Sequence, residues 1–180
     1  MRIRLAVGIA SVIVLTTAAL AWATFQPSLV YDPPKIVALD HPEHDSAENV
    51  TVRREGSAFT FASTPTPFQT NSPECEITTV VSCPRAGIEK IVVFLGSLND
   101  QADIDLEASA EKVNQVLKGQ EGEDTLVGHE GTQKLAGGDN GDILRGGPGP
   151  DILKGGSGTD TCDGGPGHDE FLSCEQAPVR

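Results

Sequence analysis

The sequence predicts an all-β fold in which short strands stack as the coils of an elongated repeat. Residues 119–172 divide into six blocks of nine residues with a shared pattern of glycine and aspartate. These blocks contain 16 of the chain's 20 glycines, and position eight of each block is a large apolar residue or a cysteine. A fixed short period indicates a repeat architecture, because such a unit buries its apolar side chain only against neighbouring copies.

Each block is predicted to form a turn followed by a strand. The first six residues contain glycines, which allow the positive φ and close backbone approach that tight turns need. The last three residues are predicted to be extended, which gives strands at 125–127, 134–136, 143–145, 152–154, 161–163 and 170–172. Their buried side chains at position eight are Leu126, Leu135, Leu144, Leu153, Cys162 and Phe171. The alternative is a flexible glycine-rich linker, but a linker has no reason to keep an apolar register.

Acidic side chains recur at position six of the blocks. This position holds Asp124, Asp142, Asp151, Asp160 and Asp169, with Gln133 as the exception. If two blocks make one coil, every second aspartate lies on the same edge. Carboxylates stacked about 4.8 Å apart, the spacing of neighbouring strands, repel one another unless a cation lies between them. Carboxylates combined with backbone carbonyls are hard oxygen ligands, and this set favours calcium.

These blocks resemble the hemolysin-type calcium-binding (RTX) repeat, whose pattern is G-G-x-G-x-D-x-U-x with U a large apolar residue. The match is complete at 146–154, whereas Asn140 replaces the third glycine of block 137–145. Blocks 119–127 and 128–136 lack the second glycine. The resemblance implies a parallel β-roll, with Ca²⁺ bound between successive turns on each edge.

Carried over to this chain, the resemblance places calcium at three aspartate pairs: Asp124 with Asp142, Asp142 with Asp160, and Asp151 with Asp169. A site between Gln133 and Asp151 lacks one charge, and Asp124 is the terminal carboxylate of its edge. The implied backbone carbonyl ligands are those of Gly138, Asn140, Gly147, Gly149, Gly156, Gly158, Gly165 and Gly167.

The part of the chain before the repeats is predicted in three segments. Residues 1–23 have a basic start, an apolar stretch and an Ala-Trp-Ala ending, which indicate a cleaved secretory signal peptide; an uncleaved membrane anchor is the alternative. Residues 24–48 form a polar, proline-rich lead-in, and residues 49–118 form a β-rich part with degenerate coils. Its predicted strands are Val50–Arg53, Ala58–Ala62, Ile77–Val81 and Ile88–Leu95. Residues 173–180 are a C-terminal cap.

Residues 103–118 fit two patterns. Leu106, Ala110, Val113 and Leu117 have helical spacing, and a glycine follows at 119. Leu117 also fits position eight of a degenerate block, which would make this stretch a strand. Local propensity favours the first reading, a short helix at about 105–117 that caps the roll.

The four cysteines indicate an oxidising compartment. Four cysteines allow three pairings. Proximity in the sequence favours Cys75–Cys83 and Cys162–Cys174, and the second bridge would join the tail to the final coil.

The net charge and the absence of catalytic motifs restrict the possible functions of the protein. The formal net charge is −13, and residues 119–172 hold 11 acidic and 3 basic residues. Nucleic acid is therefore excluded as a partner, as is a membrane once the signal is cleaved, because both need a basic face. No G-x-S-x-G or H-E-x-x-H motif occurs, and the segment His41–Asp45 is interpreted as a solvated loop.

The sequence thus predicts a secreted protein that binds calcium and is not an enzyme. The alternative is an extracellular structural or adhesive protein that uses the calcium-loaded roll as a scaffold. Its partner, a protein or a glycan surface, is not identified by the sequence.

Overall fold

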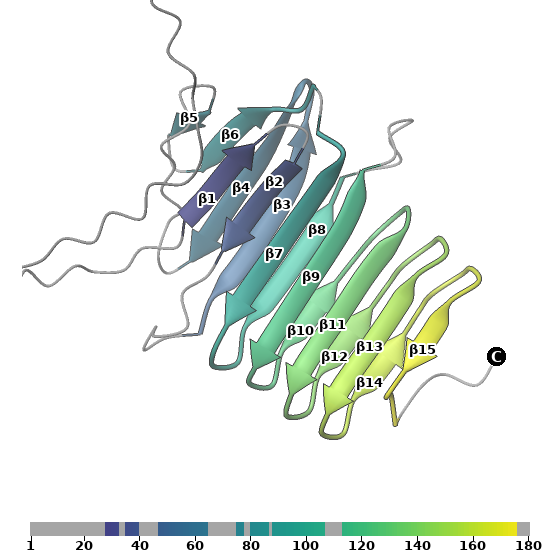
Figure 1. Cartoon of the computed structure of the whole chain (residues 1–180). Helices are drawn as coiled ribbons and strands as arrows, with labels where there is room; N and C mark the ends of the chain where they lie inside the picture. Colours follow the sequence, from purple (N-terminus) through teal and green to yellow (C-terminus); the bar gives the residue numbers. More distant parts are fainter. Residues whose placement is uncertain are drawn as a thin grey trace, which may run out of the picture.

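The computed structural model describes residues 28–32, 35–39, 47–64, 75–77, 80–86, 88–106 and 113–175, with side chains described from residue 47 onward. Two sheets face each other across a common core (Figure 1). The seven-stranded sheet contains β1 (Ser28–Asp32), β2 (Lys35–Leu39), β7 (Lys90–Gly96), β9 (Asn114–Glu121), β11 (Gln133–Asp139), β13 (Ile152–Ser157) and β15 (Glu170–Leu172), in this order. The eight-stranded sheet contains, in order, β14 (Thr161–Asp163), β12 (Ile143–Arg145), β10 (Thr125–Val127), β8 (Gln101–Asp105), β3 (Asn49–Glu55), β4 (Ala58–Thr64), β6 (Val81–Pro84) and β5 (Glu76–Ile77).

From β7 onward the chain alternates between the two sheets, so two successive strands make one coil. Strands of successive coils pair in parallel, as in β10 with β12 and in β11 with β13. The predicted parallel β-roll is therefore confirmed, and each of its six predicted strands is present. The parallel pairing also extends upstream of residue 119, through β8 to β3 and through β9 and β7 to β2.

The core of the roll is made of position-eight side chains stacked in register. Leu126 lies opposite Leu144, which lies opposite Cys162, and all three are fully buried. On the other sheet Leu135 pairs with Leu153, which pairs with Phe171. Phe171 is 37% exposed, because β15 is the last strand of its sheet. Phe171 is therefore in the predicted register, but the prediction that its side chain is buried is wrong.

The helix predicted at about 105–117 is wrong over the described part of that range. Strands β8 and β9 occupy its two ends, and residues 107–112 lie outside the described residues. In β9, Gln115 and Leu117 are buried whereas Asn114 and Lys118 are exposed, and Val113 directly before the strand is also buried, which is the two-residue period of a strand. Strand β9 also hydrogen-bonds to β7 and β11, so strand pairing overrides the helical spacing.

One other prediction of the first half needs correction. The predicted single strand Ile77–Val81 is wrong, because Ile77 ends β5 and Val81 begins β6, and these two strands pair antiparallel with Ile77 opposite Val81. Its flanking residues form the predicted disulfide Cys75–Cys83. The lead-in 24–48 contains β1 and β2, and β2 pairs in parallel with β7.

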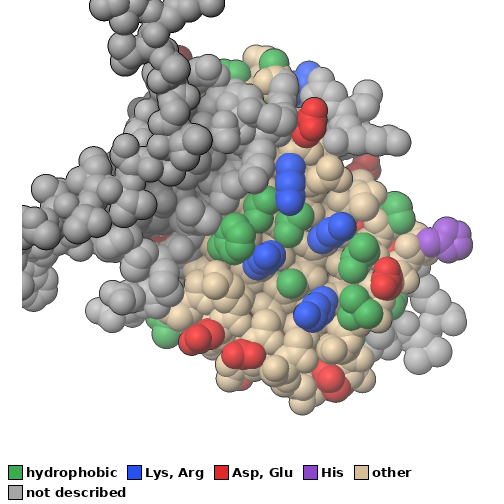
Figure 2. Space-filling model, viewed as in Figure 1, with side chains coloured by type: hydrophobic (Ala, Val, Ile, Leu, Met, Phe, Trp, Pro, Cys, Tyr) green, Lys and Arg blue, Asp and Glu red, His purple; other side chains and the backbone are tan. Residues whose placement is uncertain are grey.

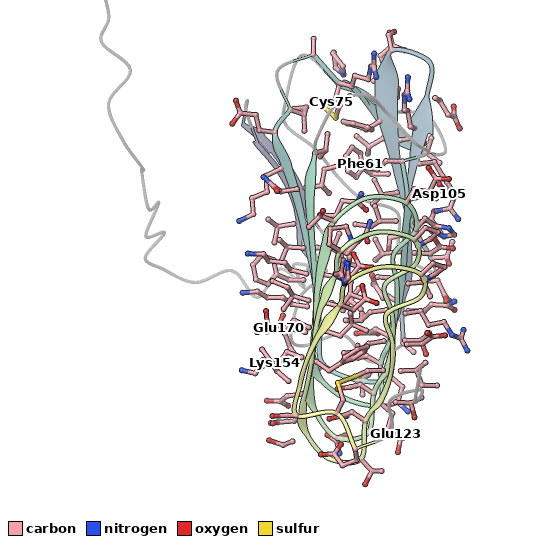
Figure 3. All side chains as sticks on the ribbon, turned by 90° about the vertical axis from the view of Figure 1, so that its right-hand side faces the viewer. Phe61, Cys75, Asp105, Glu123, Lys154 and Glu170 are labelled. Carbon is pink, nitrogen blue, oxygen red and sulfur yellow. A yellow bond between two sulfur atoms is a disulfide. The ribbon has the colours of Figure 1, made fainter. Side chains whose placement is uncertain are left out.

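The predicted signal peptide at 1–23 and the segment His41–Asp45 lie outside the described residues. The described residues include no helix that is long and apolar enough to cross a membrane. Figure 3 shows the two sheets edge-on, with Phe61 between them, Lys154 and Glu170 outside one sheet and Asp105 outside the other.

Candidate metal centre

The position-six side chains lie at the two edges where the chain passes from one sheet to the other. One edge carries Asp124, Asp142 and Asp160, which directly precede β10, β12 and β14. The other edge carries Gln133, Asp151 and Asp169 at the starts of β11, β13 and β15. The in-register strand pairing stacks the members of each set along the roll, as the two-blocks-per-coil interpretation predicted.

One oxygen of each stacked carboxylate binds the backbone of the preceding coil. The Oδ1 of Asp142 accepts a hydrogen bond from the N–H of Asp124 at 2.9 Å, and the Oδ1 of Asp160 accepts one from the N–H of Asp142 at 2.9 Å. On the second edge the Oδ1 of Asp151 accepts from the N–H of Gln133 at 2.8 Å, and the Oδ1 of Asp169 accepts from the N–H of Asp151 at 3.2 Å. These bonds fix the carboxylates between successive turns.

The second oxygen of four of these carboxylates is buried without a protein donor. It is the Oδ2 of Asp124, Asp142, Asp151 and Asp160, and each residue is at most 1% exposed. A buried ionised carboxylate without compensation is costly, and such groups are normally paired or coordinated to a metal. Four such oxygens in two rows indicate a cation as the missing partner.

The first glycine of a block leaves room for the carboxylate of the same block. A Cβ added at Gly137 would overlap the carboxylate of Asp142, and one added at Gly146 would overlap that of Asp151. Any larger residue at these positions would overlap the unpartnered oxygens themselves. The absence of a side chain at these glycines therefore makes room for the carboxylate itself.

Carbonyl oxygens of the turns lie between successive coils. A Cβ at Gly165 would overlap the carbonyl oxygen of Gly147, and one at Gly158 would overlap that of Asn140. The same relation places the carbonyls of Gly138 and Gly149 against the next coil. Four of the eight predicted carbonyl ligands thus lie between turns, and metal ligation by all eight stays a prediction.

Burial also changes the acidity of these aspartates. It raises the pKa of Asp124 to about 7 and the pKa values of Asp142 and Asp151 to about 6. The hydrogen bonds from backbone N–H groups oppose this rise, whereas neighbouring carboxylates such as Asp169 beside Asp151 add to it. Without a cation the stack therefore disfavours the charged carboxylates.

The residues present fit calcium. The donors are carboxylate and carbonyl oxygens, the ligands of a hard cation. The described residues contain no group of three or more His, Cys, Asp or Glu side chains placed to hold a metal ion. A site built largely from backbone carbonyls does not need such a group.

A comparison with family models agrees with this geometry. The model described as RTX calcium-binding nonapeptide repeat (4 copies) matches residues 136–171. Residues 136–171 are RTX calcium-binding repeats. Searches of the curated proteins and of the solved structures returned no match.

The RTX match contains four of the five predicted aspartate ligands and leaves out Asp124. The stack nevertheless continues beyond the match at both ends. Upstream, the Oδ1 of Asp124 accepts a hydrogen bond from the N–H of Asp100 at 2.8 Å, and the Oδ1 of Asp100 accepts one from the N–H of Glu48. Sequence reasoning missed Asp100 and Glu48, although each is followed two residues later by a buried residue, Ala102 and Val50.

Downstream, Glu175 takes the place of a further aspartate. Its Oε2 accepts a hydrogen bond from the N–H of Asp160 at 2.8 Å, as Asp160 does from Asp142. The adjacent Cys174 forms the predicted disulfide with Cys162, which is buried in the last coil of its sheet. The bridge holds the tail against the final coil, so Glu175 caps the row of carboxylates. The sequence predicted the bridge but not this carboxylate.

Proposed function

We propose that the protein is a secreted calcium-binding protein whose RTX repeats hold calcium between stacked turns and fold when calcium binds. The observation that carries this proposal is the pair of rows of buried aspartates, each with one oxygen on the backbone of the preceding coil and one without a protein donor. Two disulfides support an oxidising environment, which agrees with secretion. No catalytic role is proposed.

Calcium would supply positive charge between carboxylates that otherwise repel. The aspartates would bind the ion through the oxygens that have no protein donor, and the turn carbonyls would complete its oxygen shell. On each edge of the described roll, these carboxylates and carbonyls contact the neighbouring coil. Each ion would therefore join two successive coils and would not be held by a single turn.

Isothermal titration calorimetry of the disulfide-bonded protein with calcium, and separately with magnesium, tests the proposal. We expect saturable binding of more than one calcium ion at dissociation constants of about 10⁻⁴–10⁻³ M, the range of extracellular calcium modules. Magnesium should bind more weakly, because it is smaller and keeps its water. Absence of calcium binding up to about 10⁻² M, ten times the upper end of that range, would refute the proposed function.

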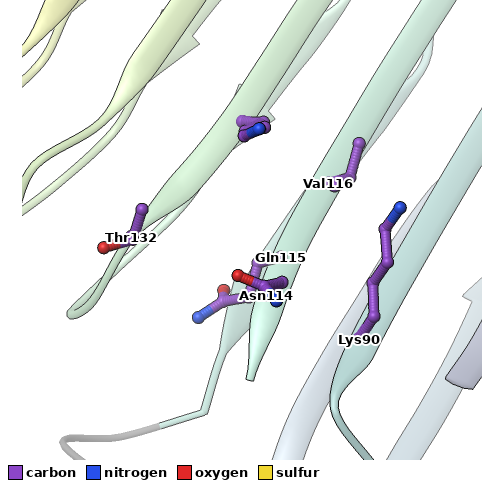
Figure 4. Close-up of a pocket in the computed structure, with 6 residues that line it drawn as sticks. Lys90, Asn114, Gln115, Val116 and Thr132 are labelled. Carbon is purple, nitrogen blue, oxygen red and sulfur yellow. The ribbon is translucent and has the colours of Figure 1, made fainter. Parts of the chain in front are cut away.

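A second candidate function, a scaffold that presents a binding face, is favoured by the outer surface of the seven-stranded sheet. Although the protein is acidic, this face carries Lys90, Lys118, Lys134 and Lys154 on neighbouring strands, among apolar side chains (Figure 2). The Nζ of Lys118 lies 5.0 Å from the ring centroid of Phe94. A pocket on this face is lined by residues of β7, β9 and β11 together with Thr132, and none of the described residues that line it is a carboxylate (Figure 4).

The lysines suit an acidic partner surface, such as an anionic glycan. Lys154→Glu should weaken binding of the calcium-loaded protein to immobilised dextran sulfate by about 1.4-fold to fivefold, on the basis of exposed ion-pair energies of about 0.2–1 kcal/mol. Arg145→Glu is the matched control, because Arg145 is equally an exposed cation but belongs to β12 of the other sheet. Equal loss for both variants would show an effect of net charge alone and would remove the support for this face.

A further inference from the structure

We propose a further calcium site outside the matched residues 136–171, between the turn at 95–100 and the turn at 119–124, with the carboxylates of Asp100 and Asp124 as ligands. This inference rests on the proposed function, because it extends the same kind of site by one coil. Neither turn lies within the residues that match the family model.

The strand register makes Asp100 the counterpart of Asp124. Strand β8 pairs in parallel with β10, with Gln101 opposite Thr125 and Ala102 opposite Leu126. Asp100 therefore precedes its strand as Asp124 precedes the next one. The two aspartates are 24 residues apart, whereas Asp124 and Asp142 are 18 apart. Because of six additional residues between β8 and β9, this coil does not follow the nine-residue period of the repeats.

The backbone of the turn at 95–100 has the conformation of the repeat turns. Positions two and four have positive φ in the RTX turns, as at Gly156 (128°) and Gly158 (141°). Gly96 (106°) and Leu98 (80°) have positive φ at the equivalent positions. A leucine adopts this region rarely, and Leu98 is 41% exposed, so burial of its side chain does not explain the strain.

The strained leucine directs a carbonyl toward the next coil. A Cβ added at Gly122 would overlap the carbonyl oxygen of Leu98, as one at Gly158 would overlap that of Asn140. The two turns are also joined by a hydrogen bond from the N–H of Glu123 to the Oδ1 of Asn99 at 2.9 Å. The two turns therefore approach each other as two consecutive RTX turns do.

The Asp124 carboxylate, which contacts the turn at 95–100 through one oxygen, has a second oxygen without a protein donor. Asp124 is 1% exposed, its Oδ1 accepts the N–H of Asp100, and its Oδ2 has no protein donor. Asp100 is 3% exposed, so both carboxylates are removed from water. A divalent cation of the calcium type satisfies this oxygen and separates the two charges.

The test counts calcium ions on the disulfide-bonded full chain by native mass spectrometry at saturating calcium. Asp100→Asn keeps a side-chain oxygen that can accept the N–H of Glu48 but removes the charge. We expect Asp100→Asn to bind one calcium ion fewer than the wild type, and Asp163→Asn, at an exposed aspartate, to bind as many as the wild type. An unchanged count for Asp100→Asn while the wild type binds calcium would overturn this inference alone.

A second comparison covers the case in which Asp100→Asn fails to fold. If Asp124 is shared by two ions, Asp124→Asn should raise the midpoint of a calcium titration about as much as Asp142→Asn does. If Asp124 is instead the terminal ligand of its edge, its effect should be clearly smaller than that of Asp142→Asn, and the inference is wrong. A wild type that binds no calcium would refute the proposed function itself, which this comparison separates from the further site.

Discussion

We expect the protein to lose most of its parallel β-structure in excess chelator and to regain it as calcium reaches millimolar levels. Without calcium the folded roll must bury several carboxylates whose second oxygen has no protein donor. Ions that bind only the folded state stabilise it by RT ln(1 + [L]/Kd) per site, which is about 1.4 kcal/mol at ten times Kd. Three such sites contribute about 4 kcal/mol, which is comparable with the whole stability of a small domain. Far-ultraviolet circular dichroism during a calcium titration measures this transition.

The variant Asp142→Ala tests whether the buried rows are responsible. Asp142 contacts the coil before it through its Oδ1 and the coil after it through its N–H. Its loss should raise the calcium midpoint by about tenfold or more, since even residues that only orient metal ligands change affinity by 10–100-fold. Asp163→Ala removes an equal charge from an exposed position and should leave the midpoint unchanged. Full β-structure in chelator, with equal and negligible shifts in both variants, would mean that the aspartates only add solubility.

The roll could be predicted because its information is local and repeated. Position six and position eight lie within one block, so Asp142 and Leu144 specify both the site and the core without reference to the rest of the chain. The stacking of these positions then follows from the period. The two disulfides could also be predicted, because each joins cysteines that are close in the sequence.

Degenerate coils were predicted before residue 119, but their site residues and strand bounds could not be predicted, because the information that specifies them is not local. Asp100 belongs to the same row as Asp124, but six extra residues break the period, and Leu98 stands where the pattern has glycine. Leu117 was assigned to a helix because its apolar neighbours have helical spacing, yet it stacks opposite Leu135 in the sheet. Glu175 was not predicted for a related reason. It lies outside the nine-residue blocks, and the disulfide-bonded tail places its carboxylate next to the N–H of Asp160. The structural roles of these residues depend on contacts with residues that are distant in the sequence.

The stability of the calcium-free protein should fall as the pH rises. The pKa values of Asp142 and Asp151 are raised from 3.8 to about 6 and that of Asp124 to about 7, chiefly by burial. Between about pH 4 and 7 the folded state therefore binds more protons than the unfolded state. Linkage then requires the stability contributed by these carboxyl groups to be present below pH 4 and to be lost as the pH rises through 6–7.

Calcium reverses this dependence, because it binds the ionised carboxylates and competes with protons. The rise in melting temperature that calcium causes should consequently be small at about pH 5 and large at about pH 8, on either side of the raised pKa values. Thermal melts with calcium and with chelator at both pH values measure it. An equal or larger calcium effect at the lower pH would contradict the prediction.

The variant Asp142→Asn should change the melting temperature in opposite directions with and without calcium, which a simple loss of stability would not do. Asparagine keeps the shape and an acceptor for the N–H of Asp124, but it carries no charge. In chelator at about pH 8 the variant should melt at a higher temperature than the wild type, because the cost of a buried uncompensated charge is gone. In saturating calcium at the same pH the order should reverse, because a ligand has been lost. Ranking of the variant below the wild type in both conditions would mean that Asp142 is stabilised in its charged form by the protein itself and not by a bound ion.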